Sequence, residues 1–252
     1  GLLGNGVDLF DPDKQSFVNL GPFSNHPLKV GHPNVMALLE DMDGDIWFGT
    51  EGAGIYVLDN QANKIIRIPT QSNSDIITNG VIKDFYQDGQ GQIWIATEGR
   101  GLFSYNTADK NLVNYTTQDG LPGMIIMGIE EDITGNLWVS TYDGLALRRT
   151  NTQLFSPFTK SDGLSSNEFT AGALLKSSTG QFYLGNNSGL DAFDPLSIRF
   201  NQNIPRIIFS RLDILNKPIE PGDSLNNTIF LTKDIIYTSE LTLTNKEKIF
   251  GL

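Results

Sequence analysis

The chain contains no cysteine and only two histidines. Disulfides and thiolate metal sites are therefore excluded. His26 and His32 lie six residues apart in a proline-containing segment, and two histidines without cysteine make a poor metal site. We expect both in surface loops and predict no metal and no cofactor. A Ser/His/Asp triad of the hydrolase type is not indicated either, because the sequence has no G-x-S-x-G.

Basic residues are also scarce: 18 Lys and Arg stand against 29 Asp and Glu, giving a net charge of −11. Nucleic-acid grooves and membrane-surface patches need clustered Lys and Arg, so neither partner is expected. No apolar run approaches the ~20 residues of a membrane span. Neutral glycans, cationic ligands and protein partners remain open.

What the chain does contain is a repeated segment. Four copies occupy residues 35–59, 81–106, 126–149 and 171–194. Each copy is centred on an aromatic residue, Trp47, Trp94, Trp138 or Tyr183, at spacings of 47, 44 and 45. A period of ~40–45 residues with one aromatic-centred strand is typical of a β-propeller. We therefore predict an all-β fold, with the three tryptophans and Tyr183 largely buried between blades.

Within a copy, a glycine precedes the aromatic by three residues, and an aspartate precedes it by six. The aspartates are Asp41, Asp88 and Asp132, with Ser177 in the fourth copy. An aspartate at the start of such a turn can accept backbone N–H bonds, and the glycine can adopt positive φ. Each copy is expected to form three strands plus a more polar fourth strand, which together make one blade.

The parity of the strands sorts the connections onto two faces. Loops after each second strand share a face with the inter-blade links 71–79, 117–123 and 161–168. Long loops on a rigid scaffold commonly bind ligands, and Tyr and Asn suit sugar recognition. The predicted ligand-binding residues on this face are Glu51, Glu98, Arg100, Tyr142, Asp143, Asn167, Glu168 and Asn187. No catalytic residue is predicted.

The tail differs from the repeats. Apolar and polar residues alternate over 206–215 and 241–250, with turn residues between them. We expect two domains: propeller blades over 1–200 and the N-terminal part of an Ig-like β-sandwich over 201–252. The phrase GNGVDLFDP near the N-terminus matches the ends of later copies, which predicts that the repeats extend beyond this chain.

The pattern D-x-x-G-x-[ILF]-W-[ILVF]-[GAS]-T-x-x-G-[IL] resembles the two-component-regulator propeller repeat. Residues 41–55, 88–102 and 132–145 match it, and the fourth copy is degenerate. The phrases DGLPGMIIM (119–127) and SDGLSSNEF (161–169) resemble the last two blades of such a propeller. The tail resembles the front half of the small sandwich that follows.

The resemblance implies about four and a half blades of seven. It also implies a periplasmic sensor region of a bacterial hybrid two-component regulator. Such a sensor would bind an oligosaccharide, signal to a histidine kinase across the membrane, and form a homodimer in the full-length protein. This segment itself is expected to be non-enzymatic and without direct membrane contact.

Two other functions stay open: a catalytic propeller, such as a polysaccharide or lactone-ring lyase, and a structural or dimerisation segment.

The sequence argues against two kinds of site, a calcium-binding loop and a sialidase active site. The acidic run from Asp41 to Asp45 hints at a calcium loop, but its glycine is at position four instead of six. A sialidase would need an arginine cluster, and up to Pro195 only Arg67, Arg100, Arg148 and Arg149 occur.

Overall fold

The computed structural model describes residues 1–68, 79–199, 208–225, 228–238, 240–243 and 250–251. Most of the predicted loop 71–79 therefore lies outside the described residues. The chain divides into two compact units, Gly1–Ile198 and Arg199–Leu252. The described residues form strands, turns and four short 3-10 helices, with no α-helix among them. The predicted all-β fold is confirmed.

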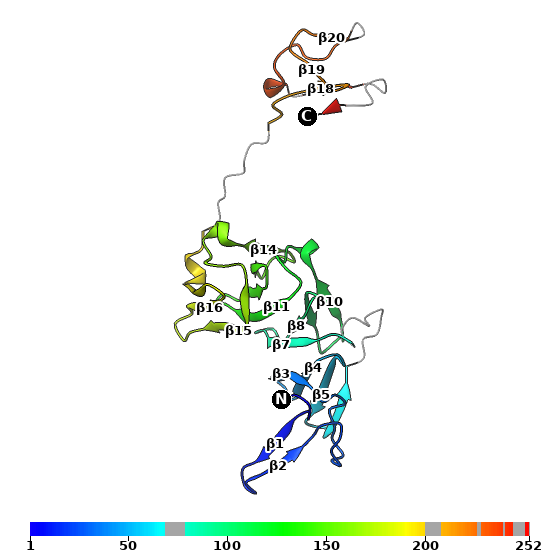
Figure 1. The fold of residues 1–252 in the computed structure, drawn as a ribbon, viewed down its shortest axis with the longest axis vertical. Helices are drawn as coiled ribbons and strands as arrows, with labels where there is room; N and C mark the ends of the chain where they lie inside the picture. Colours follow the sequence, from blue (N-terminus) through cyan, green and yellow to red (C-terminus); the bar gives the residue numbers. More distant parts are fainter. Residues whose placement is uncertain (69–78, 200–207, 226–227, 239, 244–249, 252) are drawn as a thin grey trace. The chain divides into compact units, whose positions relative to one another are not determined.

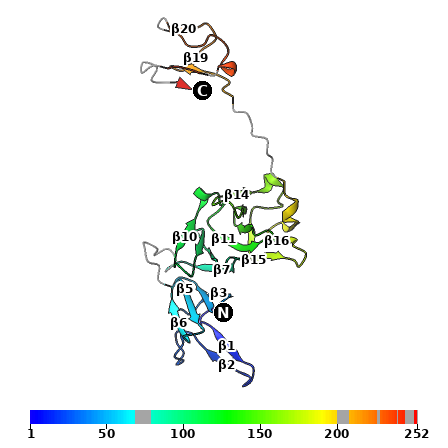
Figure 2. The same cartoon turned by 180° about the vertical axis from the view of Figure 1, so that it is seen from behind.

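The first unit consists of antiparallel sheets that follow one another along the chain (Figures 1 and 2). A hairpin of β1 (Asp8–Asp11) and β2 (Ser16–Asn19) comes first. The first blade is β3 (Val35–Glu40), β4 (Ile46–Thr50), β5 (Ile55–Asp59) and β6 (Lys64–Arg67). The second blade is β7 (Ile82–Gln87), β8 (Ile93–Thr97), β9 (Leu102–Tyr105) and β10 (Leu112–Tyr115).

The third blade is β11 (Ile126–Glu131), β12 (Leu137–Thr141), β13 (Gly144–Arg148) and β14 (Phe155–Phe158). The fourth blade has three strands in the described residues, β15 (Phe169–Lys176), β16 (Phe182–Asn186) and β17 (Gly189–Phe193). Each blade is a meander in which sequence neighbours pair. The 3-10 helices η1 (Thr117–Asp119) and η2 (Lys160–Asp162) lie in the links between blades, and η3 (Pro195–Ser197) follows the fourth blade.

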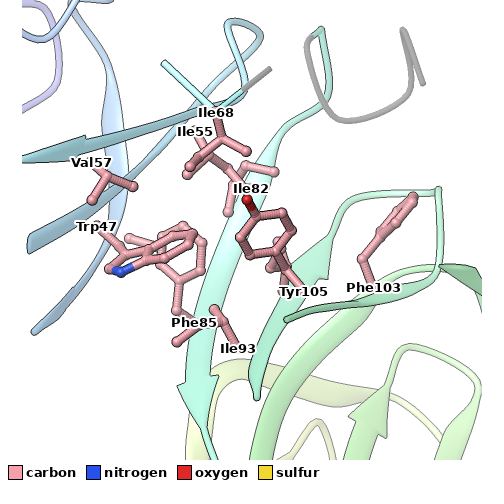
Figure 3. Close-up of a cluster of buried hydrophobic side chains, with 11 residues drawn as sticks. Trp47, Ile55, Val57, Ile68, Ile82, Phe85, Ile93, Phe103 and Tyr105 are labelled. Atoms are coloured by element: carbon pink, nitrogen blue, oxygen red, sulfur yellow. The ribbon is translucent and has the colours of Figure 1, made fainter. Parts of the chain in front are cut away.

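The first three blades bury both faces of their sheets, because successive side chains of a strand point to opposite sides and each side meets a neighbouring element. In β8, Ile93 and Ile95 join the cluster shared with the first blade, whereas Trp94 and Ala96 join the cluster shared with the third. In the first of these clusters the Trp47 ring lies against Phe85 of the second blade (Figure 3). The near-continuous apolar second strands of the repeat are therefore explained by burial on two sides.

The four aromatic anchors occupy equivalent places in the register, facing Leu39, Tyr86, Glu130 and Leu175 of the respective first strands. The three tryptophans are 1–2% exposed, as predicted. Tyr183 is only half-buried, so the prediction that it is largely buried is wrong. Each tryptophan is covered by the next blade in chain order, and no blade follows β17 in the described part of the chain.

The second unit is small. It contains β18 (Asp213–Ile214), β19 (Lys217–Pro218), β20 (Ser224–Leu225), β21 (Thr228–Ile229), β22 (Phe250–Gly251) and η4 (Ile235–Tyr237). Leu212, Ile214, Leu231 and Ile235 form its buried cluster. Residues 206–207 and 244–249 of the predicted alternating stretches lie outside the described residues. The assignment of this unit to an Ig-like sandwich stays a prediction.

Candidate functional site

The turn between the first and second strands of a blade is fixed by its aspartate. Asp41 Oδ1 accepts the backbone N–H groups of Asp43 (3.0 Å) and Asp45 (2.9 Å), and its Oδ2 accepts the indole N–H of Trp47 (2.7 Å). Both carboxylate oxygens are thus committed to the turn. This is the tight turn that the sequence favours over a calcium loop.

The same arrangement recurs twice: Asp88 binds Trp94 at 2.8 Å and Asp132 binds Trp138 at 3.0 Å. Burial raises the pKa of Asp132, but hydrogen bonds from Thr134, Trp138 and Asn136 outweigh it and lower that pKa below its usual value. In the fourth copy, Ser177 Oγ accepts the backbone N–H of Gln181 at 3.0 Å and shares a hydrogen bond with the Thr179 hydroxyl at 2.9 Å. The indole bond to the aspartate was not predicted from the sequence.

The predicted ligand-binding loops are held at the end of each blade where the first strand begins. The residue that follows the second strand donates its backbone N–H to the residue just before, or at the start of, the first strand. These bonds join Glu51 to Asn34, Glu98 to Val81, Tyr142 to Ile125 and Asn187 to Glu168. We refer to this set of loops as the loop face. Its four leading positions are equivalent under the repeat.

Bonds between neighbouring blades tie the loop face together. Glu51 forms a β-bridge with Val81, and Gly52 donates to the carbonyl of Gly80. One repeat later, Gly99 and Gly101 both donate to the carbonyl of Met124. The loops of the first two blades are therefore anchored to the first strand, or the link before it, of the blade that follows. Side chains on them are held by a rigid backbone.

The predicted residues fall into local groups on this face. Glu98 forms an ion pair with Lys83 (2.7 Å), and Glu51 accepts from the Asn34 amide (2.6 Å). Asn187 donates to Glu168 (2.6 Å). Arg100 and Tyr142 are exposed, and their side chains make no hydrogen bond with other described residues. These two side chains are therefore available to a ligand.

The remaining two predicted residues have structural contacts. Asn167 Oδ1 accepts the backbone N–H of Lys160 at 2.8 Å, which fixes the start of η2. The Asp143 carboxylate lies against Gly123, where a Cβ would overlap it. Asn167 is half-buried and Asp143 is exposed. Asn167 thus has a role in shaping its link, whereas Asp143 lines the loop face.

Lys83 also lies on the loop face, and the sequence pattern did not predict it. The first strand carries a β-bulge in each blade, and in the second blade the register shifts between Ile82 and Asp84. A bulge adds one unpaired residue and redirects its side chain. Met36 and Met127 hold the equivalent positions in the first and third blades. The bulge therefore places a cation on the loop face beside Glu98, where the first and third blades have methionine.

The two histidines lie in loops, as predicted. His26 Nδ1 accepts the backbone N–H of Leu28, and His32 Nδ1 that of Asn34, both at 3.2 Å. In the described part of the chain no three His, Asp or Glu side chains gather as a metal site would require. Among those same residues, no helix has the length and apolarity to cross a membrane.

The fold and the repeated turns define a β-propeller segment, and comparison with known proteins specifies it further. Residues 29–52, 76–99 and 120–143 match the family described as two component regulator propeller. The chain therefore carries two-component regulator propeller repeats, as the sequence motif indicated.

Relatives agree with this assignment. Histidine kinase P4 of Formosa agariphila is 25% identical over 256 residues, matching 100% of this chain and 18% of that kinase. The extracellular domain of a hybrid two-component system of B. thetaiotaomicron is 26% identical with a TM-score of 0.68, over 90% of this chain and 30% of that one. A second such domain of that bacterium, 18% identical with a TM-score of 0.59 over 87% of this chain and 27% of that one, shares the fold. The chain thus spans less than a third of these relatives.

Proposed function

We propose that this chain is part of the ligand-binding, extracytoplasmic region of a two-component sensor, and that its loop face binds an oligosaccharide. The sensor role is supported by the similarity to extracellular domains of hybrid two-component systems and to a histidine kinase. The observation that carries the binding site is the loop face itself. Four equivalent loops present polar side chains on a backbone that each blade bonds to its own first strand, and the first two loops are also bonded to the next blade.

The chemistry of the loop face suits hydroxyl groups. Glu51, Glu98 and Asp143 supply acceptors, Arg100 supplies donors, and Tyr142 supplies a ring with a polar end. A saccharide hydroxyl can donate and accept at once, so it can use both kinds of group. Because each blade contributes only one or two side chains, affinity would be spread over several contacts.

In this proposal the protein works in the periplasm, and binding is relayed through the second unit to a histidine kinase elsewhere in the protein. The full-length sensor is expected to be a homodimer. A catalytic propeller would need a base beside a cation site, and both histidines instead bond to backbone groups two residues further along their own loops. A structural segment without a ligand remains the alternative that the experiment must exclude.

The test is calorimetric titration of the chain, within the intact sensor, against a panel of oligosaccharides. Arg100→Ala and Tyr142→Ala are expected to weaken binding by roughly 1–3 kcal/mol each, the usual cost of a lost hydrogen bond to a desolvated group. The control is Asp43→Ala, an exposed residue in a turn at the opposite end of the first blade. Binding that is unaffected by both loop-face variants would contradict the proposal.

A further inference from the structure

The residue type changes without a packing reason at the position of the repeat that covers the tryptophans. Each tryptophan is covered by the residue at the end of the third strand of the following blade. The register makes these residues equivalent: Tyr105 lies opposite Ile93, Arg148 opposite Leu137, and Phe193 opposite Phe182. Two of the three are aromatic. The boundary between the second and third blades has an arginine instead.

The distances show that all three cover the tryptophan in the same way. The ring of Tyr105 lies 5.8 Å from Trp47, and that of Phe193 lies 5.3 Å from Trp138. At the middle boundary the Arg148 guanidinium lies 5.2 Å from the centre of the Trp94 ring. The fold can therefore close this boundary with an aromatic ring, so packing does not require a cation.

Arg148 is poorly satisfied by the protein. Its Nη2 donates to Gln153 Oε1 at 3.2 Å, an oxygen that the Tyr115 hydroxyl shares at 3.3 Å. Its Nε is buried and has no hydrogen-bond partner. Within the described residues it forms no ion pair, although the chain carries a net charge of −11. A partly buried cation with so few partners indicates a role beyond the fold.

Around Arg148 lies a groove of about 240 Å³ between the second and third blades. Amide side chains dominate its lining: Gln90, Gln92, Asn106, Asn111 and Gln153. Asp88 and Asp109 also reach it, and Trp94 and Tyr115 form its aromatic wall. The amides and carboxylates of the lining come from the turns after first and third strands, so this part of the groove lies at the opposite end of the blades from the loop face.

We propose that this groove binds a small neutral polyhydroxylated molecule, of the size of a single sugar ring. Amides both donate and accept, the Asp109 carboxylate accepts and Arg148 donates, which together match hydroxyl groups. Two carboxylates disfavour an anion, and Arg148 disfavours a cation. The volume is below the ~300 Å³ lower bound of typical drug-sized ligand pockets, which limits the ligand to about one ring.

The three tryptophans of the chain provide the experiment. Each indole N–H gives one signal in a ¹H–¹⁵N spectrum, and only Trp94 lines the groove. The full chain is titrated with glucose, galactose, mannose and glycerol, then with glucuronate and sulfate as anions and choline as a cation. Trp94→Phe assigns its signal. At least one neutral compound is expected to shift the Trp94 signal saturably and leave Trp47 and Trp138 unmoved.

Variants give a second criterion. Arg148→Tyr installs the residue of the equivalent position in the second blade, so it should fold, and it is expected to weaken binding at least ~10-fold because a charged donor is lost. Gln90→Ala should weaken binding several-fold, whereas its equivalent in the first blade, Asp43→Ala, should not. Wild-type affinity in Arg148→Tyr overturns the proposal. So does a Trp94 signal that ignores every neutral compound, responds only to an ion, or moves together with the other two.

The inference does not rest on the proposed function. Oligosaccharide binding at the loop face is tested by Arg100 and Tyr142, on loops that do not line the groove. Either site can therefore fail while the other stands.

Discussion

At the scale of single residues, the aspartate of each turn organises the largest side chain of its blade. Asp132 is 5% exposed and accepts the N–H groups of Thr134, Asn136 and Trp138. Removing it leaves the buried indole N–H of Trp138 and two partly buried backbone N–H groups without this acceptor, which is the costly way to lose a hydrogen bond. The indole bond also sets the tilt of the ring against the next blade.

We expect Asp132→Ala to lower the free energy of unfolding by roughly 2–4 kcal/mol, because each buried unpaired donor costs about 1–3 kcal/mol. Urea unfolding followed by tryptophan fluorescence measures this. Asp43→Ala serves as control, since the Asp43 side chain is exposed and should change stability by less than about 0.5 kcal/mol. Equal losses in both variants would refute the role given to the indole bond.

Asp84 gives a pH-dependent prediction. Burial raises its pKa to about 6, with a further contribution from the charge of Glu130, against the lowering effect of the Phe85 N–H. A carboxyl group whose folded pKa lies above the unfolded value of 3.8 destabilises the fold when ionised. The contribution of Asp84 to the free energy of unfolding therefore falls as the pH rises from roughly 4 to 6, and it stays constant at higher pH.

The equivalent positions carry Ala37, Gly128 and Ala173, so Asp84→Ala is sterically compatible with the repeat. At pH 8 it is expected to raise the free energy of unfolding by roughly 1–3 kcal/mol, and the gain should shrink towards pH 4. Denaturant titrations at a series of pH values measure it. A gain that grows on acidification would show that the sign is wrong.

The sequence predicted the turn at this scale but not all of its contacts. An aspartate before a Gly-containing turn indicates an Asx-turn through local backbone bonds. The indole bond spans six residues across a hairpin, so it depends on strand register that the local pattern does not contain. Tyr183 shows the converse: it fits the repeat pattern, and its burial depends on a neighbouring blade.

At the scale of elements, the loop after the second strand is shaped by glycines with different roles. Gly99 and Gly101 both have positive φ, 82° and 79°. A Cβ at Gly99 would meet nothing within 4 Å, whereas at Gly101 it would overlap the carbonyl oxygen of Tyr115. An alanine at Gly99 would therefore introduce backbone strain alone, whereas an alanine at Gly101 would add a steric overlap.

Gly99→Ala is expected to cost about 1–2 kcal/mol, the price of a left-handed conformation for a residue with a side chain. Gly101→Ala should cost clearly more, by a further ~2 kcal/mol or above, because β9 and β10 must separate at this end. Thermal unfolding of the two variants beside the wild type measures the difference. Equal losses of stability in the two variants would contradict the prediction, because they would show that the overlap with Tyr115 is relieved without strain.

Element order and strand type follow from the sequence, because two-sided burial produces apolar second strands between glycine turns. The bulges in the first strands do not follow. A bulge inserts one residue without a characteristic sequence here, since Met36, Lys83 and Met127 share no property. The ion pair of Lys83 with Glu98 was therefore inaccessible to sequence reasoning, although the loop position of Glu98 was predicted.

At the scale of the whole first unit, stability comes from boundaries between adjacent blades. Three separate buried clusters join the first blade to the second, the second to the third, and the third to the fourth. Comparison of the repeats also shows that Arg148 takes a place that Tyr105 and Phe193 fill in other blades, but this comparison needs the strand register. The loop face could be predicted from strand parity, whereas the groove needed the structure.

Within the residues that the structure describes, the fourth blade leaves one face of its sheet uncovered. Leu175, Tyr183 and Leu190 lie on the side of β15–β17 opposite to the cluster shared with the third blade, as the register shows. Leu175 is 61% and Leu190 is 63% exposed. Exposed apolar patches of this kind favour association. We therefore expect the chain, when produced alone, to self-associate as its concentration rises.

Sedimentation velocity over a range of concentrations measures this, at an ionic strength of about 0.15 M, where repulsion between net-negative copies is screened beyond ~8 Å. The double variant Leu175→Lys, Leu190→Glu should shift the equilibrium to monomer and leave the buried clusters intact. Leu154→Lys is the matched control, since Leu154 is 62% exposed and lies outside β15–β17. Because all three leucines are similarly exposed, a shift to monomer in the double variant that Leu154→Lys does not produce implicates the sheet face. Equal effects would assign association to surface hydrophobicity in general, and a concentration-independent monomer would show that the uncovered face does not associate.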